Sequence, residues 1–166
     1  MEVRLKEVLL EVYRTEFGRD YCFPEVEIDD SPIWWFNRGL AFHNIGRDAG
    51  AEVPFKEALR MFKVEPGTEI EQATCLMNLG SVYESTSKFY EAETNYKEAL
   101  KMYKAILGTE IEQARCLMNL GTLYSTIQEY SKARSMLESA LDICRQYPIG
   151  TEQIKNVCLK YLSQIS

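Results

Sequence analysis

Apolar residues recur every three or four positions along most of the chain, which is the spacing that buries one face of an α-helix. The two clearest runs are equivalent, and they consist of Leu76, Leu79 and Tyr83 and of Leu117, Leu120 and Tyr124. A short polar break follows each run, at 85–88 and 126–129, and a second helical run then extends over 92–103 or 133–141. The pattern predicts pairs of helices joined by tight turns.

The chain contains a near-identical internal repeat. Residues 67–80 read GTEIEQATCLMNLG and residues 108–121 read GTEIEQARCLMNLG, so only Thr74 and Arg115 differ. A degraded third copy, GTEQIKNVCLKYL, begins at Gly150, and the three starts are 41 and 42 residues apart. Self-similarity at a fixed period of this size predicts stacked helical hairpins.

The start of each unit carries signals for the end of one helix and the beginning of the next. The glycines suit a helix C′ position, where φ is positive. The next residue, a threonine, is expected to be an N-cap, with a glutamate three residues later completing a capping box. These residues are Gly67, Gly108 and Gly150; Thr68 and Thr109; and Glu71 and Glu112. Ser31 and Pro32 predict the start of an earlier helix in the same way.

The order of large and small residues resembles the tetratricopeptide repeat. The matching positions are Leu76, Leu79, Gly80, Tyr83, Ala92, Tyr96 and Ala99; then Leu117, Leu120, Gly121, Tyr124, Ala133, Leu137 and Ala140; and, in an earlier unit, Trp35, Gly39, Phe42, Ala51, Phe55 and Ala58. The resemblance covers about residues 31–166 and implies an all-α fold, a right-handed α-solenoid of helix-turn-helix repeats. The period exceeds the usual 34 residues by about seven, which is similar to the repeats of kinesin light chain and the Pins-like spindle adaptors. HEAT repeats share this period but lack the Gly–Tyr–Ala order.

We therefore expect about three full repeats between two terminal helices. The repeats are assigned to residues 31–66, 67–107 and 108–149. A helix over 2–17 and a linker to residue 30 form an N-terminal cap, and residues 150–166 form a C-terminal capping helix with a polar outer face.

The resemblance implies that the first helix of each repeat lines a concave groove that binds a peptide or a partner segment. The sixth motif position is asparagine in every full repeat, at Asn37, Asn78 and Asn119. Similar asparagines in kinesin light chain-like repeats imply an amide ladder along the backbone of an extended ligand, and a primary amide can both donate and accept hydrogen bonds. The alternative is that duplication copied the residue, although Asn37 lies in the divergent first unit.

The same geometry places further residues on or near the groove, namely Phe36, Leu40, His43, Met77, Ser81, Glu84, Arg115, Met118 and Thr122. Met77 and Met118 either form adaptable ligand pockets or pack between repeats. Arg115 either attracts an acidic ligand group or is simply solvated. The carboxylate clamp of co-chaperone tetratricopeptide domains is not expected, because the fifth motif position that holds its lysine is Phe36, Met77 or Met118 here.

Trp34, Trp35 and Phe36 stand in a row at the start of the first repeat. One helix cannot turn all three into the same core, so we expect one of them to pack under the N-terminal helix. The alternative is an exposed aromatic hot spot for a partner.

Composition limits the chemistry. The formal net charge of −6 argues against nucleic-acid binding, which needs a basic face. The five cysteines (Cys22, Cys75, Cys116, Cys144 and Cys158) are odd in number and far apart, so we expect reduced, buried thiols. No apolar run approaches the length of a membrane span. These features predict a cytoplasmic protein without membrane contact.

No constellation in the sequence indicates an enzyme, a cofactor or a metal site. His43 is the single histidine, and neither a glycine-rich phosphate loop nor an HExxH motif occurs. The favoured function is a peptide- or protein-binding adaptor. The rival is a structural subunit that forms a homodimer through its end helices, with Tyr161, Leu162 and Ile165 as the docking residues. A third reading is a segment of a longer repeat protein.

Overall fold

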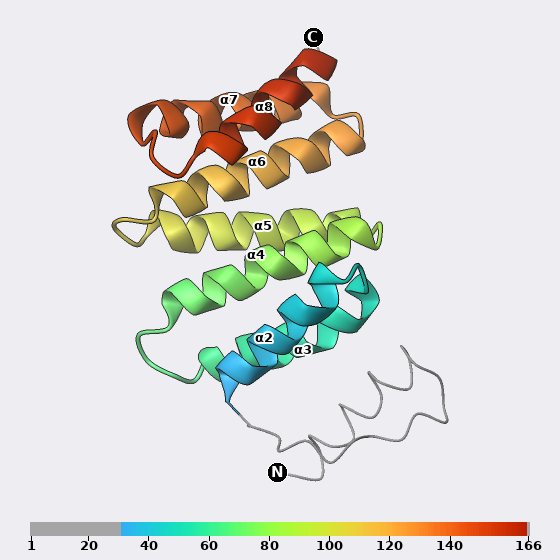
Figure 1. Ribbon diagram of the computed structural model, residues 1–166, viewed down its shortest axis with the longest axis vertical. Helices are drawn as coiled ribbons and strands as arrows, with labels where there is room; N and C mark the ends of the chain where they lie inside the picture. Colours follow the sequence, from blue (N-terminus) through green and yellow to red (C-terminus); the bar gives the residue numbers. More distant parts are fainter. Residues whose placement is uncertain (1–30, 166) are drawn as a thin grey trace. The chain divides into compact units, whose positions relative to one another are not determined.

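The computed structural model describes residues 31–165, and in this range it contains helices and turns only. The seven helices are α2 (Pro32–Asn44), α3 (Asp48–Phe62), α4 (Glu69–Ser85), α5 (Phe89–Lys104), α6 (Glu110–Thr126), α7 (Tyr130–Gln146) and α8 (Glu152–Gln164) (Figure 1). The predicted all-α helical-repeat fold is confirmed. The expected helix at 2–17, the linker to residue 30 and Cys22 lie outside the described residues.

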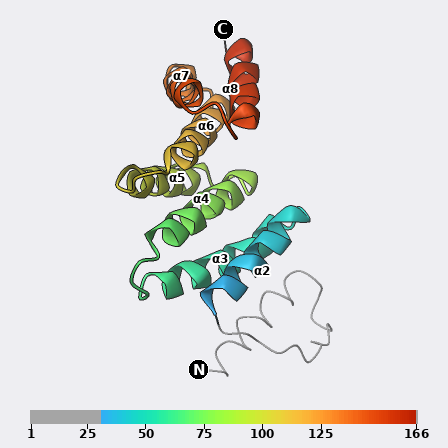
Figure 2. The ribbon, with the colours of Figure 1, turned by 60° about the vertical axis from the view of Figure 1, so that its left-hand side comes forward.

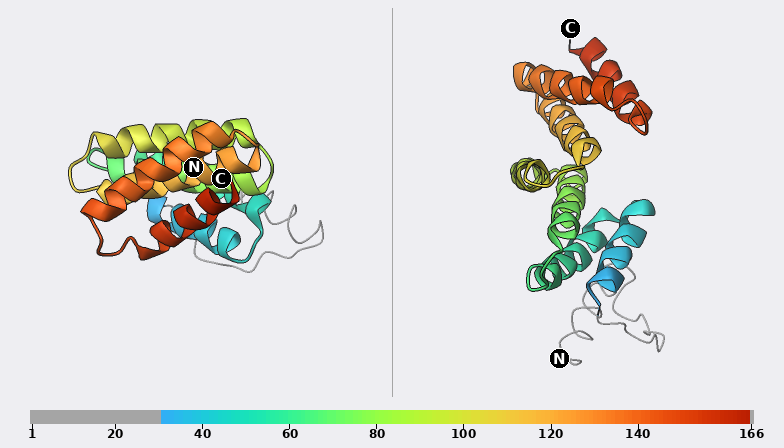
Figure 3. Two further views of the ribbon diagram at one scale, coloured as in Figure 1. Left: turned by 90° about the horizontal axis from the view of Figure 1, so that it is seen from above. Right: turned by 90° about the vertical axis from the view of Figure 1, so that its left-hand side faces the viewer.

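The chain divides into two compact units between Thr68 and Glu69. In the first unit, α2 packs against α3. In the second unit, α4 pairs with α5 and α6 pairs with α7, while α5 contacts α6 and α7 contacts α8. The first helices also meet directly, α4 with α6 and α6 with α8. Within the second unit the helices therefore stack in chain order, and the same order can be followed in the other views (Figures 2 and 3).

Each helix pair crosses closely at a glycine on its first helix. A Cβ added at Gly80 would lie 2.5 Å from the Tyr96 ring, and one at Gly121 would lie 2.6 Å from the Leu137 side chain. At Gly39 the same atom would lie 2.7 Å from a ring carbon of Phe55. A residue with a side chain does not fit at these contacts, so the glycines allow the helices to approach. This confirms the alignment of the repeats deduced from the sequence.

The large and small residues of the repeat pattern form the core. All of those predicted from the spacing are buried: Trp35, Phe42, Ala51, Phe55 and Ala58; Leu76, Leu79, Tyr83, Ala92, Tyr96 and Ala99; and Leu117, Leu120, Tyr124, Ala133, Leu137 and Ala140. On each second helix, an alanine stands three residues after the side chain that packs on the glycine. A larger side chain at this position would push the two helices of the pair apart. Trp35 is completely buried, with the Trp34 ring edge-on to it at a centroid distance of 5.1 Å.

The loops between repeats differ from the prediction at their threonines. Thr109 has φ −110° and ψ 25°, and its side chain makes no N-cap hydrogen bond. Instead its hydroxyl donates backward to Tyr103 O at 2.6 Å and to Ile106 O at 2.9 Å. The Thr68 hydroxyl makes the equivalent pair of bonds, to Phe62 O and Glu65 O, and the Thr151 hydroxyl also donates backward, to Tyr147 O and Pro148 O. The predicted capping box at Thr109 is therefore wrong, because the hydroxyl satisfies carbonyls that the preceding helix leaves open.

The glycines of these loops have the predicted positive φ, but they do not occupy the predicted C′ position. Gly67, Gly108 and Gly150 have φ values of 78°, 81° and 80°. Each lies two residues ahead of the next helix, however, and not at the C′ position of the previous one. The chain continues as turns after α3 and α5; after α5, for example, the Ile106 amide donates a hydrogen bond to Tyr103 O. The glycine with positive φ therefore comes later in the loop than the C′ position.

The turns inside each repeat hold the residues that do occupy C′. Ser87 has φ 60° and Gln128 has φ 64°. After α4, the Ser87 amide donates to Glu84 O and the Lys88 amide to Tyr83 O, and the turn after α6 has the same pattern. This pair of bonds is the Schellman motif that ends a helix. At the start of α2, Ser31 Oγ accepts from the Trp34 amide at 3.2 Å, as its position before Pro32 predicts.

The described cysteines are free thiols in the core. Cys75, Cys116 and Cys158 occupy the same position in three successive first helices and are completely buried. Burial raises the pKa of each of these thiols to about 12. At neutral pH they therefore behave as small apolar side chains. None of the helices in residues 31–165 is both long and apolar enough to cross a membrane.

Candidate protein-binding face

The second unit carries most of the predicted binding residues on two first helices, α4 and α6, which contact each other. We define the A face as the surface formed by Asn78, Ser81, Arg115, Met118, Asn119 and Thr122. These residues recur three or four positions apart along each helix, so they share one side of it. Arg115 is exposed, and the other five are half-buried. The A face is therefore a surface of amides, hydroxyls, one thioether and one guanidinium.

Met77 lies elsewhere. Its side chain is only 8% exposed, so it packs in the core, whereas the equivalent Met118 is half-buried. The sequence left both interpretations open for the two methionines, and burial favours the packing role for Met77.

Asn37, Phe36 and Leu40 belong to α2 in the first unit. Asn37 is exposed, while Phe36 and Leu40 are half-buried. The Phe36 ring packs near the Phe55 ring, with centroids 5.6 Å apart. The structure thus places two members of the predicted asparagine ladder, Asn78 and Asn119, on adjacent helices of one unit. A ladder that also includes Asn37 stays a prediction.

The amide of Asn78 forms a hydrogen bond within its own helix. Asn78 Nδ2 donates to Thr74 O of its own helix at 2.8 Å. This bond orients the side chain and leaves its carbonyl oxygen as the group offered to a ligand. The two copies of the repeated string differ at one position, which lies one turn before the asparagine. This residue is Thr74 before Asn78 and Arg115 before Asn119. The Thr74 hydroxyl bonds Tyr103 Oη at 2.8 Å, whereas Arg115 is exposed and forms no ion pair with a described residue.

Glu84 lies beside the A face, one turn beyond Ser81 on α4. The Tyr96 hydroxyl donates to Glu84 Oε2 at 2.9 Å. Burial raises the pKa of the Glu84 carboxyl, and the hydrogen bond from Tyr96 offsets this only in part. The sequence placed Glu84 near the groove and Tyr96 in the core, but it did not reveal their contact. The signal available in the sequence was that the positions of Glu84 and Tyr96 hold different residues in the other two repeats.

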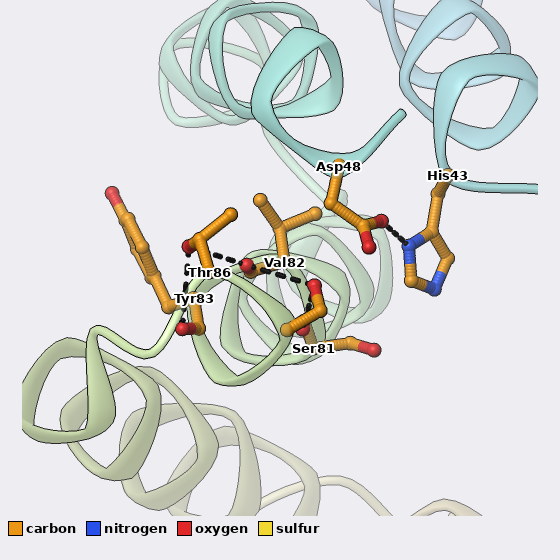
Figure 4. Close-up of polar contacts among 7 residues, drawn as sticks. His43, Asp48, Ser81, Val82, Tyr83 and Thr86 are labelled. Atoms are coloured by element: carbon orange, nitrogen blue, oxygen red, sulfur yellow. Dashed lines mark hydrogen bonds and ion pairs between the residues drawn. The ribbon is translucent and has the colours of Figure 1, made fainter. Parts of the chain in front are cut away.

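His43, at the end of α2, pairs with a carboxylate of the next helix. Its Nδ1 forms a hydrogen bond with Asp48 Oδ1 (Figure 4). The same view shows the Thr86 hydroxyl, which donates to Val82 O at the end of α4. In the described part of the chain, no group of three or more histidine, cysteine, aspartate or glutamate side chains is arranged to hold a metal ion.

The comparison with known families decides the identity of the fold. A family model described as the tetratricopeptide repeat matches residues 70–146, which extend from the first turn of α4 to the end of α7. Residues 70–146 therefore consist of tetratricopeptide repeats. Such repeats generally form protein-interaction modules, and this general role is indicated for the matched segment.

Solved structures show the same fold in other tetratricopeptide-like chains. The crystal structure of BtubC (BKLC) from P. vanneervenii is similar with a TM-score of 0.66 and 22% sequence identity. The apo form of RapI is similar with a TM-score of 0.68 and 18% identity. The alignments cover 86% and 99% of this chain but only 55% and 65% of those two proteins. At these identities the likeness shows the fold alone. A comparison with curated protein sequences finds no match.

Proposed function

We propose that this protein is an adaptor that binds a peptide segment of another protein on the A face. The observation that carries the proposal is the pair of equivalent asparagines, Asn78 and Asn119, on helices in contact with each other. Both are partly accessible, and neither is needed to fill the core. Their spacing of one repeat suits a ligand backbone that runs along the stack, which amides read without regard to side-chain sequence.

The surrounding residues support a ligand of mixed character. Ser81 and Thr122 add hydroxyls at equivalent positions, Met118 adds a soft apolar contact, and Arg115 offers a cation to an acidic group. Buried free thiols in the described residues fit a reducing compartment, so we place the adaptor in the cytoplasm.

A random peptide library displayed on phage, selected on the intact protein, provides the test. Synthetic copies of the selected peptides are then titrated against the double variant Asn78→Ala with Asn119→Ala. Each lost hydrogen bond is worth roughly 0.5–1.5 kcal/mol, so binding should weaken about five- to a hundredfold. The thermal melting temperature should stay close to that of the parent.

The matched control is Asn95→Ala on α5. Asn95 Nδ2 donates to Glu91 O at 2.8 Å, which is the same intrahelical bond that Asn78 makes. This variant should bind as the parent does. Unchanged binding by the double variant would mean that the partner uses another surface, and a large loss of stability would show that the asparagines hold the repeats together.

A second candidate is self-association through α8. Leu159 on this helix is 49% exposed, although its equivalent Leu117 on α6 is buried. The neighbouring positions are more polar, however: Asn156 and Ser163 stand where α6 has Ala114 and Gly121. This change favours a capping helix, which presents a polar outer face. Light scattering at several concentrations separates the two ideas, because the adaptor should remain a monomer at each of them.

A further inference from the structure

The middle repeat has a pair of polar residues that the other two repeats lack. Glu84 and Tyr96 are replaced by His43 and Phe55 in the first repeat, and by Ser125 and Leu137 in the third. In all three repeats the second residue of the pair fills the space beside the crossing glycine. Only Tyr96 carries a hydroxyl there, and it reaches Glu84 Oε2. The hydroxyl therefore fixes one oxygen of a carboxylate that occurs once in the repeat series.

The Tyr96 hydroxyl does not require this carboxylate. The Ser81 hydroxyl lies near the Tyr96 phenol and acts to lower its pKa, and serine is a sufficient partner for a buried hydroxyl. A half-buried carboxylate, by contrast, loses hydration and is costly unless a cation accompanies it. Satisfying Tyr96 therefore does not account for Glu84.

A second glutamate in the same unit, Glu93, has both a tyrosine partner and a lysine partner, and Glu84 can be compared with it. Glu93 accepts a hydrogen bond from the Tyr124 hydroxyl at 2.7 Å, as Glu84 does from Tyr96, but it also pairs with Lys97 at 2.5 Å. The bond from Lys97 and the bond from Tyr124 hold the pKa of Glu93 below its ordinary value. Glu84 forms no ion pair with any lysine or arginine of the described residues, and its pKa is raised. Among the described residues it is therefore a carboxylate that a tyrosine orients and that no cation accompanies.

We propose that Glu84, oriented by Tyr96, binds the ammonium or guanidinium group of a lysine or arginine in the segment that occupies the A face. This assignment rests on the proposed peptide-binding function. Glu84 lies one turn from Ser81, so a ligand that contacts Ser81 can place a long basic side chain on the free oxygen of the carboxylate. The subsite thus restricts the partner to segments with a basic residue at this register.

The test compares selections of the random peptide library on the intact parent, on Glu84→Gln and on Glu93→Gln. Glutamine keeps an oxygen that accepts from Tyr96 but removes the charge. We expect lysine or arginine to be enriched at one position on the parent and on Glu93→Gln, and this preference to disappear on Glu84→Gln. A peptide selected on the parent should bind Glu84→Gln at least about tenfold more weakly, because hydrogen bonds between charged groups are the strong ones.

A double-mutant cycle gives a readout that misfolding cannot imitate. Replacing the enriched basic residue of the peptide by alanine should weaken binding to the parent and leave binding to Glu84→Gln unchanged. Peptides that depend on Asn78 and Asn119 but show no basic preference would overturn this subsite and leave the adaptor function intact. The same preference on Glu84→Gln would overturn it as well. Selection of no asparagine-dependent peptide would defeat both proposals, and the subsite would fall with the function on which it rests.

Discussion

Gly80 is a residue at which even one added carbon atom should disturb the packing of two helices. In an exposed helix interior, Gly→Ala stabilises by up to about 1 kcal/mol, because alanine has the higher helix propensity. Here the new Cβ would lie 2.5 Å from the Tyr96 ring. Gly80→Ala should therefore lower the free energy of unfolding by about 1–3 kcal/mol, and Gly80→Leu by more. Urea titration followed by circular dichroism measures this change.

The sign of the Gly80→Ala effect is the informative part. Ser135→Ala on α7 provides an exposed helical control and should be neutral or slightly stabilising. A gain in stability for Gly80→Ala would show that the helices do not cross at this residue, and the whole repeat alignment would then shift.

Glu84 and Glu93 each accept a hydrogen bond from a tyrosine, but their titration should affect the stability of the fold in opposite directions. The raised pKa of Glu84 means that the folded state holds this proton more tightly than the unfolded state, so stability is lost as pH rises through the folded pKa. Glu93 has a lowered pKa, so its contribution is present at neutral pH and is lost as pH falls. Relative to the parent, Glu84→Gln should gain stability as pH rises above the usual glutamate pKa of about 4.3, and Glu93→Gln should lose stability as pH rises towards that value from below.

Thermal melts of the parent and both variants below and above this pH give the two slopes. Equal slopes for the variants would contradict the contrast between Glu84 and Glu93, and with it the view that no cation of the described residues accompanies Glu84.

At the scale of the turns, two residues adopt a conformation that suits glycine better. Ser87 and Gln128 have positive φ, which costs an L-residue about 1–2 kcal/mol relative to the right-handed helical region. Ser87→Gly and Gln128→Gly should each raise the free energy of unfolding by up to about 1 kcal/mol. Ser135→Gly, within α7, should lower it by about 0.5–1 kcal/mol. Chemical denaturation distinguishes the signs, and destabilisation by both turn variants would contradict the C′ assignment.

The loops between repeats give a different test, because their threonines act on the helix before them. Thr109→Val keeps the shape of the side chain but removes its bonds to Tyr103 O and Ile106 O. We expect a loss of about 1–2 kcal/mol in the free energy of unfolding. Glu112→Gln should cost less than this in the same urea titration. In a capping box Glu112 would bond the Thr109 amide and the two losses would be similar.

At the scale of the whole molecule, the sequence predicted what depends on repeated sterics. The Gly–Tyr–Ala order fixed the helix pairs, the crossings and the buried residues, because each close approach admits only a small side chain. The period then located Asn78 and Asn119 on the same side of adjacent helices. Contacts between side chains of different helices were beyond this reasoning. The Tyr96–Glu84 bond and the backward bonds of Thr109 depend on which groups meet after packing, and a local motif such as T-x-x-E does not contain that information.

Met77 and Met118 show the same limit. They stand in strings of fourteen residues that differ only at Thr74 and Arg115, yet one is in the core and the other is half-buried. Nearly identical local sequence gives no reason for different burial, so we attribute the difference to what packs around each helix. This is why the sequence predicted the A face as a set of positions but not the accessibility of each member.

The last prediction concerns how many repeats the binding site needs. Helices α4–α8 pack on one another and form a continuous unit, so residues 69–166 expressed alone should give a strongly helical spectrum and one cooperative thermal transition. If the site is the A face of α4 and α6, this fragment should bind the selected peptides within a fewfold of the intact protein. If Asn37 completes a ladder of three, the fragment should instead lose about two- to tenfold in affinity, the share of one hydrogen bond. The variant Asn37→Ala in the intact protein must then show the same loss, because an exposed amide has no other reason to affect binding.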